Sequence, residues 1–207
     1  MNILKIKKKL AFYSRKIAAD KLTIGASGNL STISGNYIYI KSSGCCFENI
    51  KPSDFVKLNL KSPSTKNLKK RPSSEYRLHI ACYKKRPDIK FIFHTHPIVS
   101  TTLYSAGLKD KPLTMEFAVY IGNAIGVVNF ASPGSIVLAK KVAEKAKECD
   151  SIIIKKHGLV TFGKSAQEAY LRALIIEREA RATFLCKLFK VKPPSLSEKE
   201  LNSLVNI

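Results

Sequence analysis

Two short apolar runs, each followed at once by histidine, constrain this 207-residue chain more than any other feature. The run at 89–93 (IKFIF) leads into His-Thr-His at 94–96, and the run at 151–156 (SIIIKK) leads into His157. Runs of this length are typical of buried β-strands and fall far short of the ~20 residues of a membrane-spanning helix. The sequence therefore predicts a sheet with histidines at the ends of two inner strands.

The rest of the chain alternates between strand-like and helical patterns. Two strands at 29–33 and 37–41 flank Ser34-Gly35-Asn36, a typical hairpin turn. The pattern Ser165-x-x-Glu168 is a capping box and predicts a helix that runs to about residue 189. Further strands are expected at 54–60, 126–130 and 159–163, a connecting segment at 113–121, and further helices up to residue 22 and at 73–85, 98–106 and 134–148.

The composition is that of an ordinary globular protein, with 45% hydrophobic residues and no low-complexity tract. Neither an internal repeat nor an interdomain linker is visible, so we expect one domain over 1–207, with a C-terminal tail at 190–207. The basic N-terminus lacks the uninterrupted apolar core of a signal peptide, because residues 13–16 break it. The five cysteines are odd in number and show no C-x-x-C spacing. We therefore expect a cytoplasmic protein with reduced thiols.

A formal net charge of +21 invites a nucleic-acid hypothesis. The excess is mostly lysine, however, and arginine, which reads bases with two parallel hydrogen bonds, occurs at only seven positions. The lysines are scattered along the chain, with local density at 5–9 and 66–71, and no nucleic-acid-binding module is recognisable. We expect no nucleic-acid partner. A field of this sign would also attract a small phosphorylated substrate.

The histidines at the strand ends are candidate metal ligands. Side chains at i and i+2 of a strand share a face, so His94 and His96 are expected to point the same way. His157 also leaves a buried strand, and Gly158 beside it permits a close approach of backbone or ligand. Three protein ligands with one open position are typical of catalytic metal sites. The alternative to a metal site is that these histidines form only the polar ends of two buried strands. His79, in a predicted helix, is read as a supporting or core histidine.

A carboxylate and three small-residue loops complete the candidate site. Glu75 is predicted in the first turn of a helix, where the helix macrodipole stabilises a negative charge. Serines at 73–74 are expected to cap this helix, and their amides could bind an anion. Loops at 28–29 and 42–44 offer further backbone amides, with glycine leaving room for a ligand. Each loop alone is an ordinary turn, but together they suit a phosphorylated, oxygen-rich substrate.

The motifs and their order resemble the class II aldolase/adducin family. The resemblance extends from about residue 8 to 190. It is carried by GNLS (28–31), SSG (42–44), PSSEYRLH (72–79), YKKRPDIKFIFHTHP (83–97) and HGLVTFG (157–163). The fold that it implies is a three-layer α/β/α sandwich with a central, mostly antiparallel mixed sheet. It also implies a homotetramer with sites between subunits.

The resemblance also implies roles for individual residues. In the sugar-phosphate aldolases of the family, zinc is bound by three histidines that match His94, His96 and His157. A glutamate that matches Glu75 closes the metal site at rest and then acts as the base. Mn²⁺, Co²⁺ or Fe²⁺ would also suit such ligands. The phosphate is held by residues that match Gly28, Asn29, Ser43, Gly44, Ser73 and Ser74.

The implied reaction is the reversible cleavage of a ketose 1-phosphate similar to L-fuculose 1-phosphate, giving dihydroxyacetone phosphate and an aldehyde. The aldolases take a further acid, a tyrosine, from the neighbouring subunit, in the stretch that matches 112–122. Here Tyr120 is slightly displaced from that place. Glu116 stands in the same region, as in the family's dehydratases that act on 5-methylthioribulose 1-phosphate.

Two other members of the family give alternatives. The ribulose-5-phosphate 4-epimerases usually carry aspartate where this chain has Glu75. Adducin-like relatives bind other proteins without catalysis and have lost metal ligands, whereas this chain keeps the three histidines. The aldolase is the activity that the sequence favours.

Overall fold

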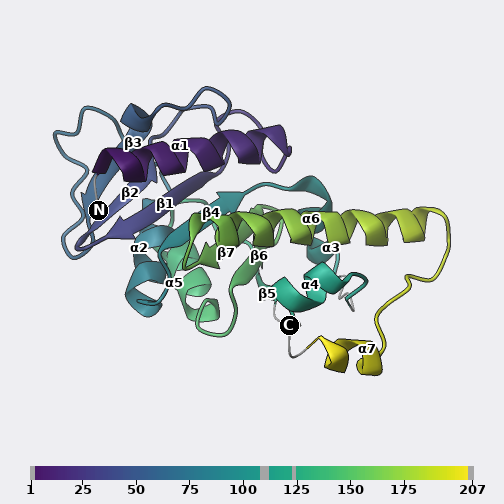
Figure 1. Cartoon of the computed structure of the whole chain (residues 1–207). Helices are drawn as coiled ribbons and strands as arrows, with labels where there is room; N and C mark the ends of the chain where they lie inside the picture. Colours follow the sequence, from purple (N-terminus) through teal and green to yellow (C-terminus); the bar gives the residue numbers. More distant parts are fainter. Residues whose placement is uncertain (1–2, 108–111, 123–124, 205–207) are drawn as a thin grey trace.

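A seven-stranded sheet forms the centre of the computed structural model, which describes residues 3–107, 112–122 and 125–204 (Figure 1). Its strand order is β3-β2-β1-β4-β7-β6-β5. Only β5 and β6 run parallel; the other neighbours are antiparallel. The predicted mixed, mostly antiparallel sheet is confirmed. The strands are β1 (Asn29–Ser34), β2 (Tyr37–Lys41), β3 (Phe55–Asn59), β4 (Phe91–Thr95), β5 (Ile125–Val128), β6 (Ser151–Ile154) and β7 (Gly158–Gly163).

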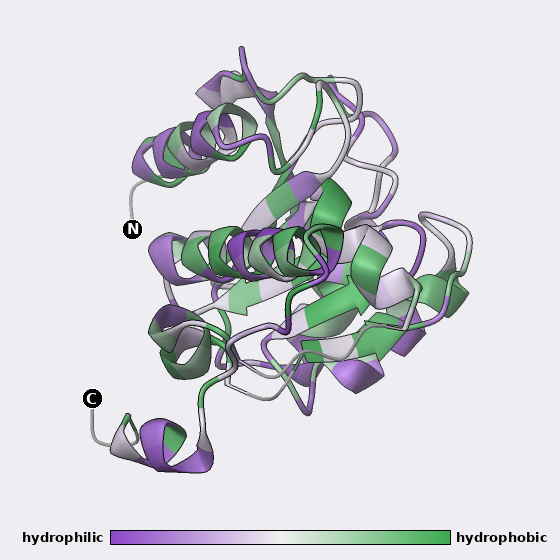
Figure 2. Cartoon of the chain, turned by 90° about the vertical axis from the view of Figure 1, so that its right-hand side faces the viewer, coloured by the Kyte–Doolittle hydropathy of each residue, from purple (hydrophilic) through white to green (hydrophobic). Residues whose placement is uncertain are grey.

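Helices cover both faces of the sheet. One apolar core lies between the sheet and α1 (Ile3–Ala19), α3 (Ile98–Ser105), α4 (Met115–Tyr120) and α6 (Ala166–Leu188). A second core lies on the other face, under α2 (Tyr76–Lys85) and α5 (Ile136–Lys145). In Figure 2 the helices carry both polar and apolar residues, while the central strands are mostly apolar. Burial on both faces explains why β4 and β6 are apolar runs rather than alternating patterns.

The alternation of side chains along β4 decides on which face the candidate site lies. Phe91 and Phe93 pack into the core under α1 and α6, whereas Ile92 packs into the core under α2 and α5. His94, two residues after Ile92, therefore points toward the α2 face. Asn29 of β1 is paired with His94 across the sheet and lies on the same face.

Several predicted boundaries were wrong by one to three residues. The predicted strand 151–156 ends at Ile154, because the chain turns back over 155–157 into β7 with Lys156 in the left-handed region (φ 59°). Conversely, β4 continues to Thr95, so His94 lies inside the strand. The opening helix ends at Ala19 rather than near residue 22.

The start of α2 also differs from its prediction. The helix begins at Tyr76, and Glu75 itself occupies the N-cap position instead of the first turn. The hydroxyl of Ser73 accepts from the Glu75 amide (3.3 Å), so this serine stabilises the turn before the helix. By contrast, Ser165 caps α6 as predicted, accepting from the amide of Glu168.

Beyond α6, the chain makes few contacts with the rest of the molecule. The Leu196 amide donates to the carbonyl of Pro112 (2.8 Å), and the short helix α7 (Glu198–Ser203) has no buried residue. Among the described helices, none combines the length and apolar character needed to cross a membrane.

Candidate metal centre

Three histidines converge at the end of the sheet where β4 and β6 finish. The Nε2 atom of His94 lies 3.2 Å from Nε2 of His157 and 3.2 Å from Nε2 of His96. Within the described ranges, these residues form the one group of three or more histidine, cysteine or acidic side chains close enough to share a metal ion. The predicted face-sharing of His94 and His96 is confirmed, and His157 joins them from the β6–β7 turn.

The backbone fixes the direction of these imidazoles. His94 is fully buried, and its Nδ1–H donates to the carbonyl of Leu159 in β7 (3.1 Å), so Nε2 is the atom left to bind a metal ion. Burial lowers the pKa of His94, but the charge and hydrogen bond of Glu75 outweigh burial and raise it. Gly158 allows the close approach of the other two rings. A Cβ there would lie 2.4 Å from the Thr95 carbonyl oxygen and 2.6 Å from Cδ2 of His96. The glycine after His157 is therefore a packing requirement of the histidine cluster.

Glu75 closes the cluster from the start of α2. Its Oε2 lies 3.1 Å from Nε2 of His94, and its Oε1 lies 3.5 Å from Nε2 of His157. The side chain is buried, yet Oε1 has no hydrogen-bond partner. Burial alone would raise the pKa of Glu75, but the charge and hydrogen bond of His94, with His157 and Asn29, hold it well below its usual range. The carboxylate is thus kept ionised, with one oxygen free.

The donor set fits a divalent metal ion. Nitrogens that bind zinc tetrahedrally at ~2.0–2.1 Å are about 3.3 Å apart, close to the two 3.2 Å separations here. Burial, followed by the charge of His94, lowers the pKa of His157 to about 4 and that of His96 to about 3. Both rings are therefore neutral near pH 7, the form that binds metals. With a metal bound, the Nε2 lone pairs of all three rings would point at one shared cation, which explains why these nitrogens face one another.

The three predicted anion-binding loops lie next to one another. Ser42 forms a β-bridge with Pro72, and the Ser43 amide donates to the Arg71 carbonyl (2.9 Å), which places loop 42–44 beside residues 72–74. The loop before β1 is joined to them through the ammonium of Lys41, which donates to the Ala26 carbonyl (2.9 Å). Ser43, Gly44 and Ser74 are exposed, whereas Ser73 is buried.

Two of the predicted residues have structural tasks that the sequence did not indicate. Gly28 has φ 75°, and a Cβ there would lie 2.5 Å from the carbonyl oxygen of His94. The glycine is therefore required by contact with β4, a reason that the sequence did not indicate, and the predicted room for a ligand stays a prediction. The side-chain amide of Asn29 is buried and bonded to Glu75 (Nδ2 to Oε2, 3.0 Å) and His79 (Oδ1 to Nε2, 2.5 Å).

Sequence reasoning missed Lys41. This lysine is 1% exposed, and its ammonium lies 5.1 Å from the ring centroid of Phe47. Burial lowers the pKa of Lys41, because the charged form is desolvated. The lysine ends an apolar strand and stands directly before Ser-Ser-Gly. This position could have indicated a buried lysine, but the chain contains many other lysines from which the sequence alone does not distinguish it.

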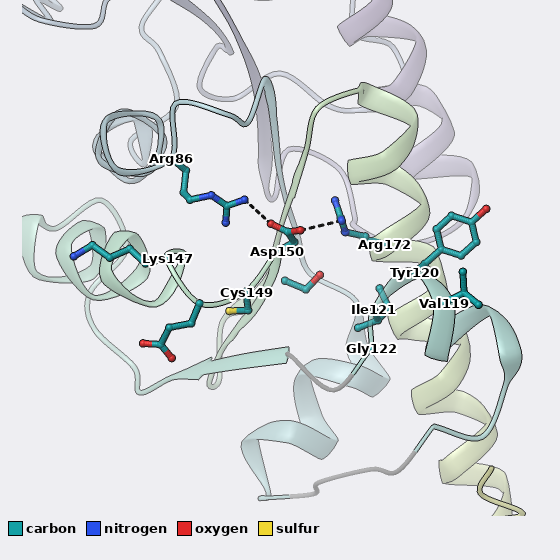
Figure 3. A pocket seen from close by; sticks show the side chains of 11 residues that line it. Arg86, Val119, Tyr120, Ile121, Gly122, Lys147, Cys149, Asp150 and Arg172 are labelled. Carbon is teal, nitrogen blue, oxygen red and sulfur yellow. Dashed lines mark hydrogen bonds and ion pairs between the residues drawn. The ribbon is translucent and has the colours of Figure 1, made fainter. Parts of the chain in front are cut away.

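The two candidates for the acid lie away from the histidines. Tyr120 lines a cavity of about 450 Å³ with Arg86, Asp150 and Arg172 (Figure 3). Asp150 precedes β6, whereas His157 follows it, so this cavity is at the opposite end of the sheet. Glu116 lies beside α6, near Arg178 and Glu179. The structure therefore brings neither Tyr120 nor Glu116 to the metal centre of its own chain.

Comparisons with known proteins find similarity over most of the chain. Residues 8–184 match the family model for the Class II Aldolase and Adducin N-terminal domain. An L-fuculose phosphate aldolase of Methanocaldococcus jannaschii is 34% identical over 184 residues, covering 89% of this chain and 98% of that protein. A 5-methylthioribulose-1-phosphate/5-deoxyribulose-1-phosphate aldolase of Escherichia coli is 27% identical over 201 residues, covering 97% and 93%.

Solved structures give the same result. The structure of an L-fuculose 1-phosphate aldolase superposes with a TM-score of 0.84 at 26% identity, covering 98% of this chain and 95% of that one. The family model and the 34% identical relative both span most of the chain. The chain belongs to the class II aldolase and adducin N-terminal domain family.

Proposed function

We propose that the protein is a metal-dependent class II aldolase that reversibly cleaves a ketose 1-phosphate similar to L-fuculose 1-phosphate into dihydroxyacetone phosphate and an aldehyde. The observation that carries the proposal is the cluster of three imidazoles whose Nε2 atoms meet beside an ionised carboxylate with one free oxygen. The relatives named as aldolases of fuculose phosphate and methylthioribulose phosphate support the substrate class.

The metal would be held by His94, His96 and His157, with Glu75 as a fourth ligand at rest. We propose Zn²⁺ for this site, and Mn²⁺, Co²⁺ or Fe²⁺ would suit the same ligands. When bound, the ion supplies Lewis-acid polarisation of the substrate carbonyl and stabilises the negative charge that develops after cleavage. Glu75 then acts through Oε1, its free oxygen. In the condensation direction the carboxylate removes a proton from C3 of dihydroxyacetone phosphate. In the cleavage direction it first takes up a proton in exchange with solvent, and gives it to C3 of the enediolate after the C3–C4 bond breaks.

The phosphate is assigned to the three adjacent loops. Gly28, Asn29, Ser43, Gly44, Ser73 and Ser74 are the proposed contacts. The buried ammonium of Lys41 lies among these loops and adds a positive charge to them. For the aldehyde end we propose the cavity of about 370 Å³ next to His96 and His157, which α3 borders with Ile98 and Thr101.

The group that takes the proton of the C4 hydroxyl during cleavage, and returns it to the aldehyde oxygen as an acid in condensation, is proposed to come from a second copy of the chain in a homotetramer. Tyr120 is 47% exposed at the far end of the sheet, and Met115 and Val119 of the same helix are also exposed. An exposed apolar helix with a tyrosine at its end suits a contact between subunits. Glu116, also exposed, is the second candidate for this acid.

The experiment offers the metal-loaded protein L-fuculose 1-phosphate, 5-deoxyribulose 1-phosphate and 5-methylthioribulose 1-phosphate, and measures dihydroxyacetone phosphate with a coupled assay. Triose phosphate from at least one of them is expected. Loss of water from 5-methylthioribulose 1-phosphate, without triose phosphate, would instead identify the dehydratase that Glu116 allows. A protein that is isolated without metal and binds none would favour a non-catalytic adducin-like role. Epimerisation of ribulose 5-phosphate is the remaining outcome to assay.

A further inference from the structure

A buried chain of hydrogen bonds continues from Glu75 into the core under α2, and the proposed reaction does not by itself require it. Oε2 of Glu75 is 3.0 Å from Nδ2 of Asn29, and Oδ1 of Asn29 is 2.5 Å from Nε2 of His79. Nδ1 of His79 is 2.7 Å from the hydroxyl of Ser31, which lies 2.9 Å from the hydroxyl of Tyr83. None of the five residues is more than 5% exposed. They come from β1, α2 and the turn before α2.

The ionised state of Glu75 determines which atom donates in each hydrogen bond between Glu75, Asn29 and His79. An ionised carboxylate can only accept hydrogen bonds, so Asn29 must turn its N–H toward Glu75 and its oxygen toward His79. The His79 Nε2 atom must then carry the proton. With the amide reversed, its oxygen would lie against a carboxylate oxygen, and two acceptors would repel each other in a buried place.

The other nitrogen of His79 completes the assignment. Burial, followed by the charge of His94, lowers the pKa of His79 to about 3, so the ring is neutral near pH 7. A neutral ring with a proton on Nε2 accepts at Nδ1, and the hydroxyl of Ser31 is placed to donate there. Both ring nitrogens are thus used, and His79 has no lone pair left for a metal ion.

We propose that His79, as the neutral tautomer protonated at Nε2, is a positioning residue for the base. It fixes the side chain of Asn29, which binds Oε2 of Glu75 and leaves Oε1 free to react. The inference rests on the proposed function, because it assigns Glu75 the role of base. It also gives the Asn29 side chain a task inside the protein. A contact between Asn29 and the phosphate then falls to its backbone or its second amide hydrogen.

A first experiment reads the tautomer without any substrate. Protein labelled with ¹⁵N-histidine and loaded with zinc is examined by long-range ¹H–¹⁵N NMR between pH 6 and pH 8, and the His79 signals are identified by their loss in His79→Gln. We expect a protonated Nε2 and a bare Nδ1 throughout this range. A proton on Nδ1, or a mixture of the two tautomers, would overturn the proposal.

A second experiment uses two amides that mimic different nitrogens of the ring. In His79→Gln the side-chain nitrogen can take the place of Nε2 and still donate to Asn29. In His79→Asn the shorter amide reaches only the place of Nδ1, beside Ser31. We expect His79→Gln to keep kcat within about 5-fold of the wild type and His79→Asn to lose on the order of 100-fold, because a base displaced by about 1 Å costs this much.

The two variants also separate positioning from a general loss of structure. KM and bound metal should stay close to wild-type values in both variants, since neither residue change touches the histidine ligands. Equal losses of kcat in both variants, or no loss in either, would contradict the positioning role. If the wild type releases no triose phosphate from any ketose phosphate, the proposed function fails. The NMR measurement still decides the arrangement of His79 in that case.

Discussion

Both ends of the sheet carry clustered polar side chains, but these side chains have hydrogen-bond partners at one end and lack some of them at the other. At the far end, Asp150 accepts from Arg86 (2.8 Å) and from Arg172 (2.9 Å), so each carboxylate oxygen has a partner (Figure 3). At the histidine end, Oε1 of Glu75 and Nδ1 of His157 are buried without partners. The cavity beside Asp150, at about 450 Å³, is larger than the cavity beside His96 and His157, at about 370 Å³. The larger cavity therefore lies at the end where both carboxylate oxygens of Asp150 have partners.

This contrast shows that buried polar atoms without hydrogen-bond partners mark the candidate site better than the size of a cavity does. Arg86 and Arg172 also donate to the carbonyls of Ala146 and Phe162, so they join α5, β6, β7 and α6. The arginine end is therefore built for stability. The histidine end contains buried polar atoms without hydrogen-bond partners, which lowers the stability of the fold unless a ligand binds to them.

The most severe test of the contrast is His94→Ala, which removes the central ligand. We expect bound metal to disappear and kcat/KM on the ketose phosphate to fall at least about 1,000-fold, because Lewis-acid stabilisation is worth several kcal/mol. Elemental analysis and the coupled assay measure the two effects. Metal retained at wild-type stoichiometry would show that the site is assigned to the wrong residues.

The next largest effect is expected from Glu75→Gln. The amide keeps the shape of the side chain but cannot move the proton, so kcat should fall about 100- to 1,000-fold. Because the three histidines remain, the variant should still bind metal. A variant with unchanged kcat in a steady-state assay would remove Glu75 from the reaction.

A pH series on the metal-free protein tests whether His79, His96 and His157 are held in their neutral form. The folded-state pKa values of His79 and His96, about 3, and of His157, about 4, lie below the usual 6.5. Unfolding therefore lets these three groups take up protons below pH 6.5, and their contribution to stability should be lost from 6.5 toward 4. Glu75 raises the pKa of His94, whose contribution is instead present below pH 6.5 and lost as the pH rises above it. Each group contributes up to about 1.4 kcal/mol per pH unit.

The lowered pKa of Glu75 acts in the same direction at still lower pH, since its stabilising contribution is lost as the pH falls. Thermal unfolding of the metal-free protein at several pH values measures the slope. The variant His96→Asn should decline less steeply than the wild type between pH 6.5 and pH 5. A wild-type melting temperature that rises on acidification from pH 6.5 to pH 4 would contradict the assignment of neutral rings to His79, His96 and His157.

The smallest effect on stability and activity is expected from Arg172→Met, at the Asp150 end of the sheet. Loss of the bond to Asp150, which is itself partly exposed, should cost about 1–2 kcal/mol. That corresponds to a fall of roughly 3–6 °C in the melting temperature. Bound metal should stay at the wild-type level. Metal loss in this variant would mean that the two ends are coupled and that the contrast is invalid.

The parts of the site that follow local rules could be predicted from the sequence. The shared face of His94 and His96 follows from the period of a strand, and His157 is marked by the apolar run before it. Links between distant segments could not be predicted in this way. Asn29 and Glu75 are 46 positions apart, and only the packing of β1 against the turn before α2 brings them together.

Predictions that depended on backbone detail were partly wrong for the same reason. The apolar pattern of 151–156 continues past the strand, because the pattern records burial and does not record the turn that Lys156 makes. Lys41 was overlooked because its position, buried among three loops, depends on tertiary structure. The glycine at position 28 was noticed, but its real neighbour is the carbonyl of His94.

The close packing of Gly28 against the His94 carbonyl fixes the distance between the two parts of the proposed site, the phosphate loop and the metal ligands. The loop assigned to the phosphate touches the strand that carries the central metal ligand, and Asn29 pairs directly with His94. Under the proposed function, the span from phosphate to metal is fixed by backbone and cannot stretch. The protein would then select substrates by the distance between phosphate and carbonyl, favouring 1-phosphates over 5-phosphates. Under the same proposal, the aldehyde end at the cavity beside α3 would lie outside this contact and would accept groups of different size.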